Sequence, residues 1–233
     1  MDKPPIDAVV FDMDGVLIDS EALWGEVREE FASEHGLVWR PEDQESIMGF
    51  NTAMWSRVMV ERLGLRERLG MDEAGVAREI ERRLLDKYRR NLPQRLGAVA
   101  AVRLAATRHK VALATGSSRE VASHVIDAIG LGGVFLACTF GDDVAVGKPA
   151  PDIYLNVLAK IGTAPGQAVG VEDSANGIRS LRAAGMAVIA APGPQFPLSA
   201  EVLALADARI DDMRDFTLET VARAAGRGAA QRR

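Results

Sequence analysis

The chain has 233 residues, of which 48% are hydrophobic and 26% are charged, proportions typical of a globular protein with a sizeable core. Its formal net charge of -5 gives no reason to expect a nucleic-acid partner, and no apolar run approaches membrane-spanning length. The N-terminus lacks a basic region followed by an apolar core, and the single cysteine, Cys138, has no intrachain partner. We therefore expect a cytoplasmic protein with a buried, inert thiol.

The first predicted element is a strand over residues 6 to 12 that leads into two acids. Its apolar run has no polar alternation, which is typical of a strand buried on both faces. Asp12 and Asp14 lie two residues apart, so in an extended chain their carboxylates share a face and can converge on one cation or electrophile. Ligands of open α/β sheets bind at this end of the strands, although an Asp here is often only a turn former.

Residues 20 to 90 are predicted to be entirely helical. Apolar residues recur at helical spacing in three stretches, which contain Leu23, Met54 and Val76, and no strand-like run interrupts them. The block is also rich in Arg and Glu. We expect it to form a small domain of its own.

After Pro93 the predicted strands and helices alternate. Strands are expected at 111–114, 134–138, 168–171 and 187–190, and helices at 94–108, 118–129, 151–161 and 174–184. The alternation predicts a parallel sheet covered on both faces, to which the first strand also belongs. The helical block is therefore an insertion, with hinges near residues 17 to 20 and 89 to 93. Residues 226 to 233 are expected to be a frayed basic tail.

The second predicted strand leads into Thr115-Gly116-Ser117-Ser118. Glu120 lies three residues after Ser117, which is the pattern of a capping box. A hydroxyl, a glycine and free amides at a helix N-terminus also form an anion site, so this segment has both a structural and a functional interpretation.

The next two strands lead into a lysine and two further acids. A lone lysine is usually a solvated surface charge. Lys148, however, stands directly before Pro149, which fixes the backbone there and so holds the lysine in position. Glu172 and Asp173 end the fourth strand, where an ordinary helix cap is the structural alternative. Parallel strands end at the same edge of a sheet, so the polar groups that follow the four strands should lie close together there. Four strand ends that all carry such groups indicate a ligand site.

These motifs resemble those of the haloacid dehalogenase superfamily, in its branch with a helical cap after the first strand. The matching segments are Asp12-Met13-Asp14-Gly15-Val16, Thr115-Gly116-Ser117, Gly147-Lys148-Pro149-Ala150-Pro151-Asp152 and Glu172-Asp173-Ser174-Ala175-Asn176-Gly177. The resemblance spans nearly the whole chain. It implies an α/β fold, with a Rossmann-like parallel-sheet core of residues 1–19 and 91–233 and an inserted all-helical cap of residues 20–90.

The resemblance also implies residue roles. Asp12 would be the nucleophile, which splits hydrolysis into formation and breakdown of an aspartyl phosphate, and Asp14 the general acid and base. The residues implied to bind the substrate phosphate are Thr115, Gly116, Ser117 and Lys148. Magnesium would be held by Asp12, the carbonyl of Asp14, Asp173 and Glu172, the last either directly or through water; this cation prefers oxygen ligands.

The expected function is magnesium-dependent hydrolysis of a small-molecule phosphate monoester, such as a sugar phosphate, by a monomer. The alternative is a β-phosphoglucomutase-like sugar phosphomutase. Where that family has a cap histidine this chain has Trp24, and residues 41 to 56 contain no basic residue to grip a second phosphate. This departure favours hydrolysis. Trp24, Phe50 and Asn51 are the candidate specificity residues of the cap.

Three other activities fit less well. A dehalogenase needs neither magnesium nor the acids Asp14 and Asp173. A phosphonatase needs a cap lysine for a Schiff base, and the only lysine of the cap is Lys87, near the hinge. A phospho-acceptor signalling domain is shorter and has no cap; retention of the phosphoryl group on Asp12, without hydrolysis of any ester, would indicate one.

Overall fold

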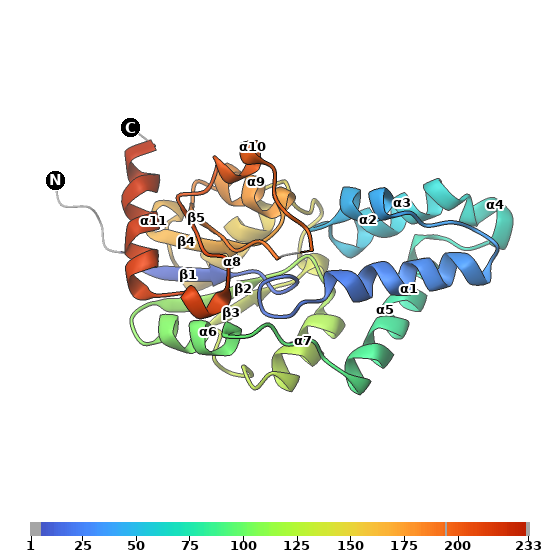
Figure 1. Ribbon diagram of the computed structural model, residues 1–233, viewed down its shortest axis with the longest axis horizontal. Helices are drawn as coiled ribbons and strands as arrows, with labels where there is room; N and C mark the ends of the chain where they lie inside the picture. The colour runs from blue at the N-terminus through green and yellow to red at the C-terminus, as the bar shows by residue number, and fades with distance from the viewer. Residues whose placement is uncertain (1–5, 194, 232–233) are drawn as a thin grey trace.

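A six-stranded parallel sheet forms the centre of the computed structural model, which describes residues 6–193 and 195–231 (Figure 1). The strand order is β3-β2-β1-β4-β5-β6. The strands are β1 Ala8–Phe11, β2 Lys110–Ala114, β3 Ala137–Thr139, β4 Ala168–Glu172, β5 Ala187–Ala190 and β6 Ala208–Arg209. The predicted α/β fold is confirmed, and β1 lies in the middle of the sheet, paired with β2 and β4.

Helices cover both faces of the sheet. One face packs against α6 Ala98–Ala106, α7 Arg119–Ala128 and α11 Leu218–Gln231, and the other against α8 Asp152–Ile161, α9 Ala175–Ala183 and α10 Ala200–Leu203. Alternate residues of β1 belong to the two cores: Val9 and Phe11 to the first, Ala8 and Val10 to the second. All four are fully buried, which explains why β1 has no polar alternation.

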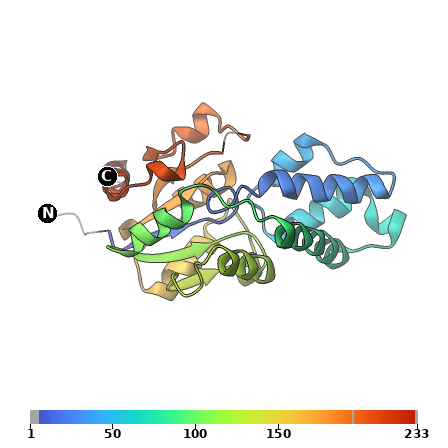
Figure 2. The ribbon, with the colours of Figure 1, turned by 60° about the horizontal axis from the view of Figure 1, so that its bottom comes forward.

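The predicted helical cap lies beyond the carboxyl ends of the strands (Figures 1 and 2). Its helices are α1 Glu21–Glu34, α2 Pro41–Ile47, α3 Thr52–Leu63, α4 Leu65–Leu69 and α5 Glu73–Arg90. The long helix α5 packs against both α1 and α3. The two short helices, α2 and α4, were not predicted, because seven and five residues are too few for a helical period to show. None of the described helices is long and apolar enough to cross a membrane.

Two linkers that run side by side connect the cap to the core. The Asp19 N–H donates to the Pro93 carbonyl at 2.8 Å, and the Arg95 N–H donates to the Leu17 carbonyl at 3.0 Å. Ile18 also forms an antiparallel bridge with Gln94. The cap therefore begins and ends at one place, as two adjacent hinges require, and hinge motion stays a prediction.

Arg95 is a buried arginine just after the second linker. Only 6% of its surface is exposed, and its guanidinium donates to the carbonyls of Gly15, of Ala191 at 2.8 Å and of Pro192 at 3.2 Å. It therefore joins the loop after β1 to the segment after β5.

We expect Arg95→Met to lower the free energy of unfolding by about 2–4 kcal/mol, because buried carbonyls would lose their donor. Urea unfolding measures the change. Arg103→Met, at an exposed position of α6, is the matched control and should cost less than about 0.5 kcal/mol. An equal effect of the two substitutions would contradict the structural role of Arg95.

The strand predicted at residues 134 to 138 is shorter and later than expected. It begins at Ala137, because residue 134 closes a turn and residues 135 and 136 form a bend, and Cys138 is half-buried instead of buried. Burial still raises the pKa of the Cys138 thiol, which keeps it protonated and unreactive.

The predicted basic tail is wrong for residues 226 to 231, which continue helix α11; residues 232 and 233 lie outside the described part. Val221 and Ala224 of this helix are buried in the core. At Gly228 an added Cβ would lie 3.0 Å from the Cβ of Ala187, so the helix packs closely on β5. Small residues at the contact, which carry little hydrophobic signal, explain why the sequence did not predict it.

Candidate active site

Lys148 lies between two carboxylates at the carboxyl edge of the sheet. Its Nζ is 2.7 Å from an oxygen of Asp12, after β1, and 2.5 Å from an oxygen of Glu172, at the end of β4. The Tyr154 hydroxyl of α8 donates to the same Glu172 oxygen at 2.6 Å. Burial by itself would lower the pKa of Lys148, but the charges of Asp12 and Glu172 raise it above its usual value. Lys148 is therefore a fixed positive charge.

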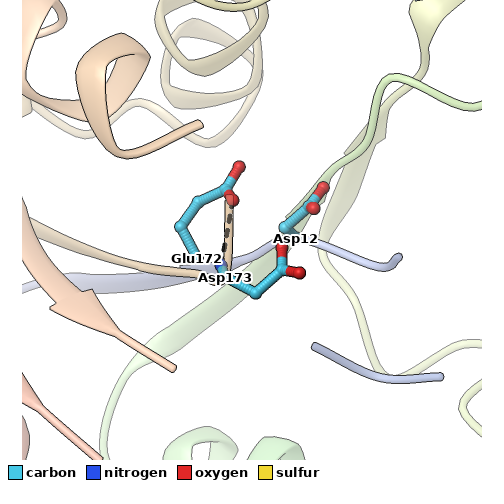
Figure 3. Close-up of side chains that lie close together, drawn as sticks. All are labelled: Asp12, Glu172 and Asp173. Atoms are coloured by element: carbon cyan, nitrogen blue, oxygen red, sulfur yellow. Dashed lines mark hydrogen bonds between the residues drawn. The ribbon is translucent and has the colours of Figure 1, made fainter. Parts of the chain in front are cut away.

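Asp12, Glu172 and Asp173 form a buried acidic cluster, shown in Figure 3. One carboxylate oxygen of each lies within 4.8 Å of the others. Burial, and then the charge of Glu172, raise the pKa values of both Asp12 and Asp173 well above the usual range. Like charges held this close inside a protein need a cation, and a set of hard oxygen donors suits a divalent one.

Glu172 is held by more donors than the other two acids. Its second oxygen accepts from the backbone N–H groups of Asp173 at 3.1 Å and Ser174 at 3.2 Å, and from the Ser174 hydroxyl. Lys148 and Tyr154 occupy its first oxygen. Both oxygens are therefore engaged, and the side chain is fixed in place.

Gly15 follows the Asp-x-Asp pair and leaves room for Asp173. Its φ is +74°, and an added Cβ would lie 1.8 Å from Oδ2 of Asp173. A side chain here would displace the carboxylate or the loop that carries Asp14.

We expect Gly15→Ala to weaken activation by Mg²⁺ by about tenfold or more, because displaced ligands bind metal poorly. The apparent metal affinity is measured by titrating activity with Mg²⁺. Gly36→Ala is the matched control: its φ of +67° brings the same backbone strain, but no atom lies within 4 Å of the added Cβ. It should cost stability of about 1 kcal/mol without changing the metal requirement. Equal metal affinities in the two variants would contradict the role given to Gly15.

Asp14 is held by both domains. Its Oδ1 accepts from the Ser20 hydroxyl at 2.6 Å and from the Trp24 indole N–H at 3.1 Å, both at the start of the cap. Its Oδ2 accepts from the Ser117 hydroxyl of the core at 2.6 Å, with the Thr115 hydroxyl at 3.4 Å. The side chain is thus oriented only while cap and core are together.

The predicted capping box at Ser117 is wrong. Ser118 is the N-cap of α7, and its hydroxyl accepts from the Val121 N–H. The Ser117 hydroxyl binds Asp14 instead, and its backbone N–H donates to the Thr115 hydroxyl at 3.1 Å. Tertiary contact with Asp14 therefore decides which serine caps the helix.

A cavity of about 40 Å³ lies between the cap and the polar groups at the carboxyl edge of the sheet. The core residues that line it are Asp12, Asp14, Gly116, Ser117, Lys148, Asp173 and Ser174. The cap residues that line it are Glu21, Trp24, Arg28, Gln44, Ile47, Met48, Gly49, Phe50 and Trp55. An added Cβ at Gly116 would lie 2.8 Å from the Phe50 carbonyl, so the cap is closed on the core.

Three predicted residues, Thr115, Asn51 and Glu172, are not among those that line the cavity. Glu172 is fully buried against Lys148 and Tyr154. Thr115 is fully buried beside Asp14 and Ser117. Asn51 is also fully buried; its amide N–H₂ reaches the carbonyls of Gly141 at 3.3 Å and Val144 at 3.4 Å, which belong to the core. The structure therefore gives Asn51 contacts that hold the cap on the core.

Sequence reasoning did not select the cap residues Glu21, Arg28 and Gln44. A signal for Arg28 was available: it lies four residues after Trp24 on the face of α1 that also carries Phe31. A charged residue within an apolar stripe marks a polar site in a core. Glu21 and Gln44 had no such signal.

Comparison with known proteins identifies the family of the chain. The family model described as haloacid dehalogenase-like hydrolase matches residues 6–185, which include all four motifs. The chain belongs to this family. A phosphorylated carbohydrates phosphatase of Thermotoga maritima is 32% identical over 181 residues, 78% of this chain and 82% of that protein. Hexitol phosphatase B of Escherichia coli K12 is 30% identical over 213 residues, 90% of this chain and 94% of that protein.

Among solved structures, the haloacid dehalogenase-like chain superimposes on CbbY from Rhodobacter sphaeroides in complex with phosphate. The TM-score is 0.78 at 25% sequence identity, over 93% of this chain and 99% of CbbY. Both of these curated relatives match over most of their length and are named phosphatases, so this haloacid dehalogenase-like hydrolase is a phosphoric monoester hydrolase.

Proposed function

We propose that the chain is a Mg²⁺-dependent phosphatase that hydrolyses a small-molecule phosphate monoester through an aspartyl phosphate on Asp12. The observation that carries the proposal is the placement of Asp12, which lies against the fixed charge of Lys148 and beside a carboxylate cluster that suits a divalent cation. Sugar and polyol phosphates are the substrate class, because the similar phosphatases are named for phosphorylated carbohydrates and hexitols.

In the first half of the reaction an oxygen of Asp12 attacks phosphorus and the ester oxygen leaves. Lys148 neutralises part of the charge on the transferring group, and the backbone N–H of Gly116, which lines the cavity, would donate to its oxygens. Ser117 lines the cavity too, but its hydroxyl donates to Asp14 and would have to turn to reach the phosphoryl group. Asp14 protonates the leaving oxygen. In the second half Asp14 takes a proton from water, which attacks the acyl phosphate and restores Asp12.

Asp12 and Asp173 are the direct metal ligands in this proposal, with the Asp14 carbonyl. Glu172 positions Lys148 and the Asp173 backbone, because both of its oxygens already accept from neighbours. When bound, Mg²⁺ would supply the positive charge that brings the anionic ester to the carboxylate nucleophile.

A panel of phosphate monoesters, assayed for released phosphate with and without Mg²⁺, tests the proposal. We expect hydrolysis of p-nitrophenyl phosphate and of some sugar or polyol phosphates, and loss of activity with EDTA. Assay of a sugar 1-phosphate primed with a sugar bisphosphate tests the mutase alternative. Failure to release phosphate from any ester, or isomerisation faster than hydrolysis, would contradict the proposal.

Trp24 and Phe50 remain the proposed specificity residues from the sequence, since both line the cavity. Asn51 acts on specificity only through the position of the cap. A cytoplasmic location and a monomeric state stay predictions.

A further inference from the structure

Arg28 is a buried cation in the cap. Its side chain is on the inner face of α1, and only 4% of the residue surface is exposed. The guanidinium carbon lies 4.6 Å from the ring of Trp24 and 4.8 Å from the ring of Trp55. Two indoles can stabilise a guanidinium by cation–π attraction, which makes the buried charge tolerable but leaves its N–H groups unsatisfied.

Within the described part of the chain, the guanidinium has a single hydrogen-bond acceptor. Nη1 donates to the Gln44 side-chain carbonyl at 2.8 Å, and the Gln44 amide in turn donates to Glu21 at 3.3 Å. Nε is buried without a partner, and among the described residues no carboxylate lies within 4.0 Å of the guanidinium. A guanidinium offers five donors, and a buried one is ordinarily paired with an acid.

The position of Arg28 indicates what supplies the missing acceptor. Arg28 lines the same cavity as Asp12 and Lys148, on the cap side, where the organic part of a phosphate ester must lie. Burial lowers the pKa of Arg28 to about 10, so the group is still protonated near neutral pH. A ligand oxyanion in the cavity would therefore meet an unpaired, desolvated cation.

The groups around Arg28 also indicate the charge of the ligand group. Glu21 lines the cavity too and reaches Arg28 through Gln44. Burial and the charge of Asp14 raise the pKa of Glu21 to about 7, so near neutral pH it is ionised in part and offsets part of the guanidinium charge. One partly offset cation matches a single negative charge better than a dianion, and the small cavity favours a compact group. Both considerations point to a carboxylate and away from a second phosphate.

We propose that Arg28 is a specificity-determining residue that pairs with a carboxylate on the leaving group, so that the preferred substrates are phosphate monoesters of hydroxy acids or sugar acids. The inference rests on the proposed phosphatase function, and within the small-molecule phosphate monoesters it places the acidic sugar and polyol derivatives ahead of the neutral ones.

Matched substrate pairs test it on the wild-type enzyme. 3-Phosphoglycerate and glycerol 3-phosphate differ only in carboxylate against hydroxymethyl, as do 6-phosphogluconate and glucitol 6-phosphate. We expect kcat/KM to favour the acid of at least one pair by about tenfold or more, which is typical for a charge-assisted hydrogen bond. Where a pair is not turned over, its two members are compared as inhibitors of p-nitrophenyl phosphate hydrolysis, with the same expected ratio.

Substitutions then assign the preference to Arg28. Arg28→Gln keeps hydrogen-bonding capacity but removes the charge, and should bring the acid-to-alcohol ratio toward one, mainly through loss on the acid. Arg28→Lys should retain part of the ratio. Arg57→Gln, at an exposed position of α3, is the matched control and should keep the wild-type ratio. Thermal unfolding checks that each variant is folded.

The outcomes separate this inference from the proposed function. Equal rates and equal inhibition by acid and alcohol in the wild type would overturn the role of Arg28, even if Arg28→Gln does not fold. If Arg28→Gln lowers kcat/KM for the acid and for the alcohol of a pair by the same factor, Arg28 has a purely structural role. The ratio of kcat/KM for fructose 1,6-bisphosphate to that for fructose 1-phosphate is compared with the acid-to-alcohol ratios. If the bisphosphate ratio is the larger, the cavity has a second phosphate site instead of a carboxylate site. No hydrolysis of any ester, including p-nitrophenyl phosphate, would overturn the phosphatase function itself.

Discussion

Replacement of Asp12 by asparagine should lower kcat at least about a thousandfold, because an amide cannot act as the nucleophile and binds Mg²⁺ poorly. The fold should survive. Burial and the charge of Glu172 raise the pKa of Asp12, so its ionised carboxylate carries a free-energy cost in the folded protein. A neutral residue of the same size removes that cost, although Lys148 loses one acceptor.

Steady-state phosphate release and the midpoint of urea unfolding measure the two effects. We expect the Asp12→Asn protein incubated with substrate to show no phosphoryl adduct by mass spectrometry. Asp127→Asn, at an exposed position of α7, is the control for an aspartate-to-asparagine change elsewhere and should keep wild-type turnover. Activity of Asp12→Asn within tenfold of wild type would exclude Asp12 as the nucleophile.

The core of the site could be predicted because parallel strands repeat one geometry. Each strand brings its carboxyl end to the same edge of the sheet, so Asp12, Lys148 and Asp173 could be placed together before their contacts were known. The order of the strands in the sheet could not be predicted from the sequence, and the structure shows β1 between β2 and β4. The Tyr154 contact with Glu172 could not be predicted, since it depends on how α8 packs against the sheet.

The cap was harder to predict, because helices identify a buried face but not what lies opposite it. The pattern around Trp24 correctly placed α1, yet the buried charge of Arg28 becomes meaningful only when the ring of Trp55, from α3, is seen beside it together with the ring of Trp24. Asn51 resembled a substrate contact, and it is instead the N-cap of α3 and a link to the core. Contacts between elements far apart in the sequence decided both cases, within the cap for Arg28 and between cap and core for Asn51, and one sequence carries little information on such contacts.

Asp14→Asn should separate the two halves of the reaction. p-Nitrophenolate is a good leaving group and needs no proton, so Asp12 should still be phosphorylated, whereas breakdown of the aspartyl phosphate lacks the base that activates water. We expect a burst of about one equivalent of p-nitrophenol, followed by turnover about 100- to 10,000-fold slower than wild type. Alkyl phosphates, whose leaving oxygen needs a proton, should show no burst.

The hydrogen bonds of Asp14 provide a control for this prediction. Trp24→Phe removes the indole N–H that donates to Asp14 Oδ1 but keeps an aromatic ring, while Ser20 and Ser117 still hold the carboxylate. Because the acid itself remains, this variant should slow turnover of alkyl phosphates by about tenfold or less and show no burst with p-nitrophenyl phosphate. Rapid steady-state turnover of p-nitrophenyl phosphate by Asp14→Asn would mean that another group activates the water. A burst in Trp24→Phe as large as that in Asp14→Asn would mean that the cap, by orienting Asp14, controls breakdown of the intermediate as strongly as the acid does.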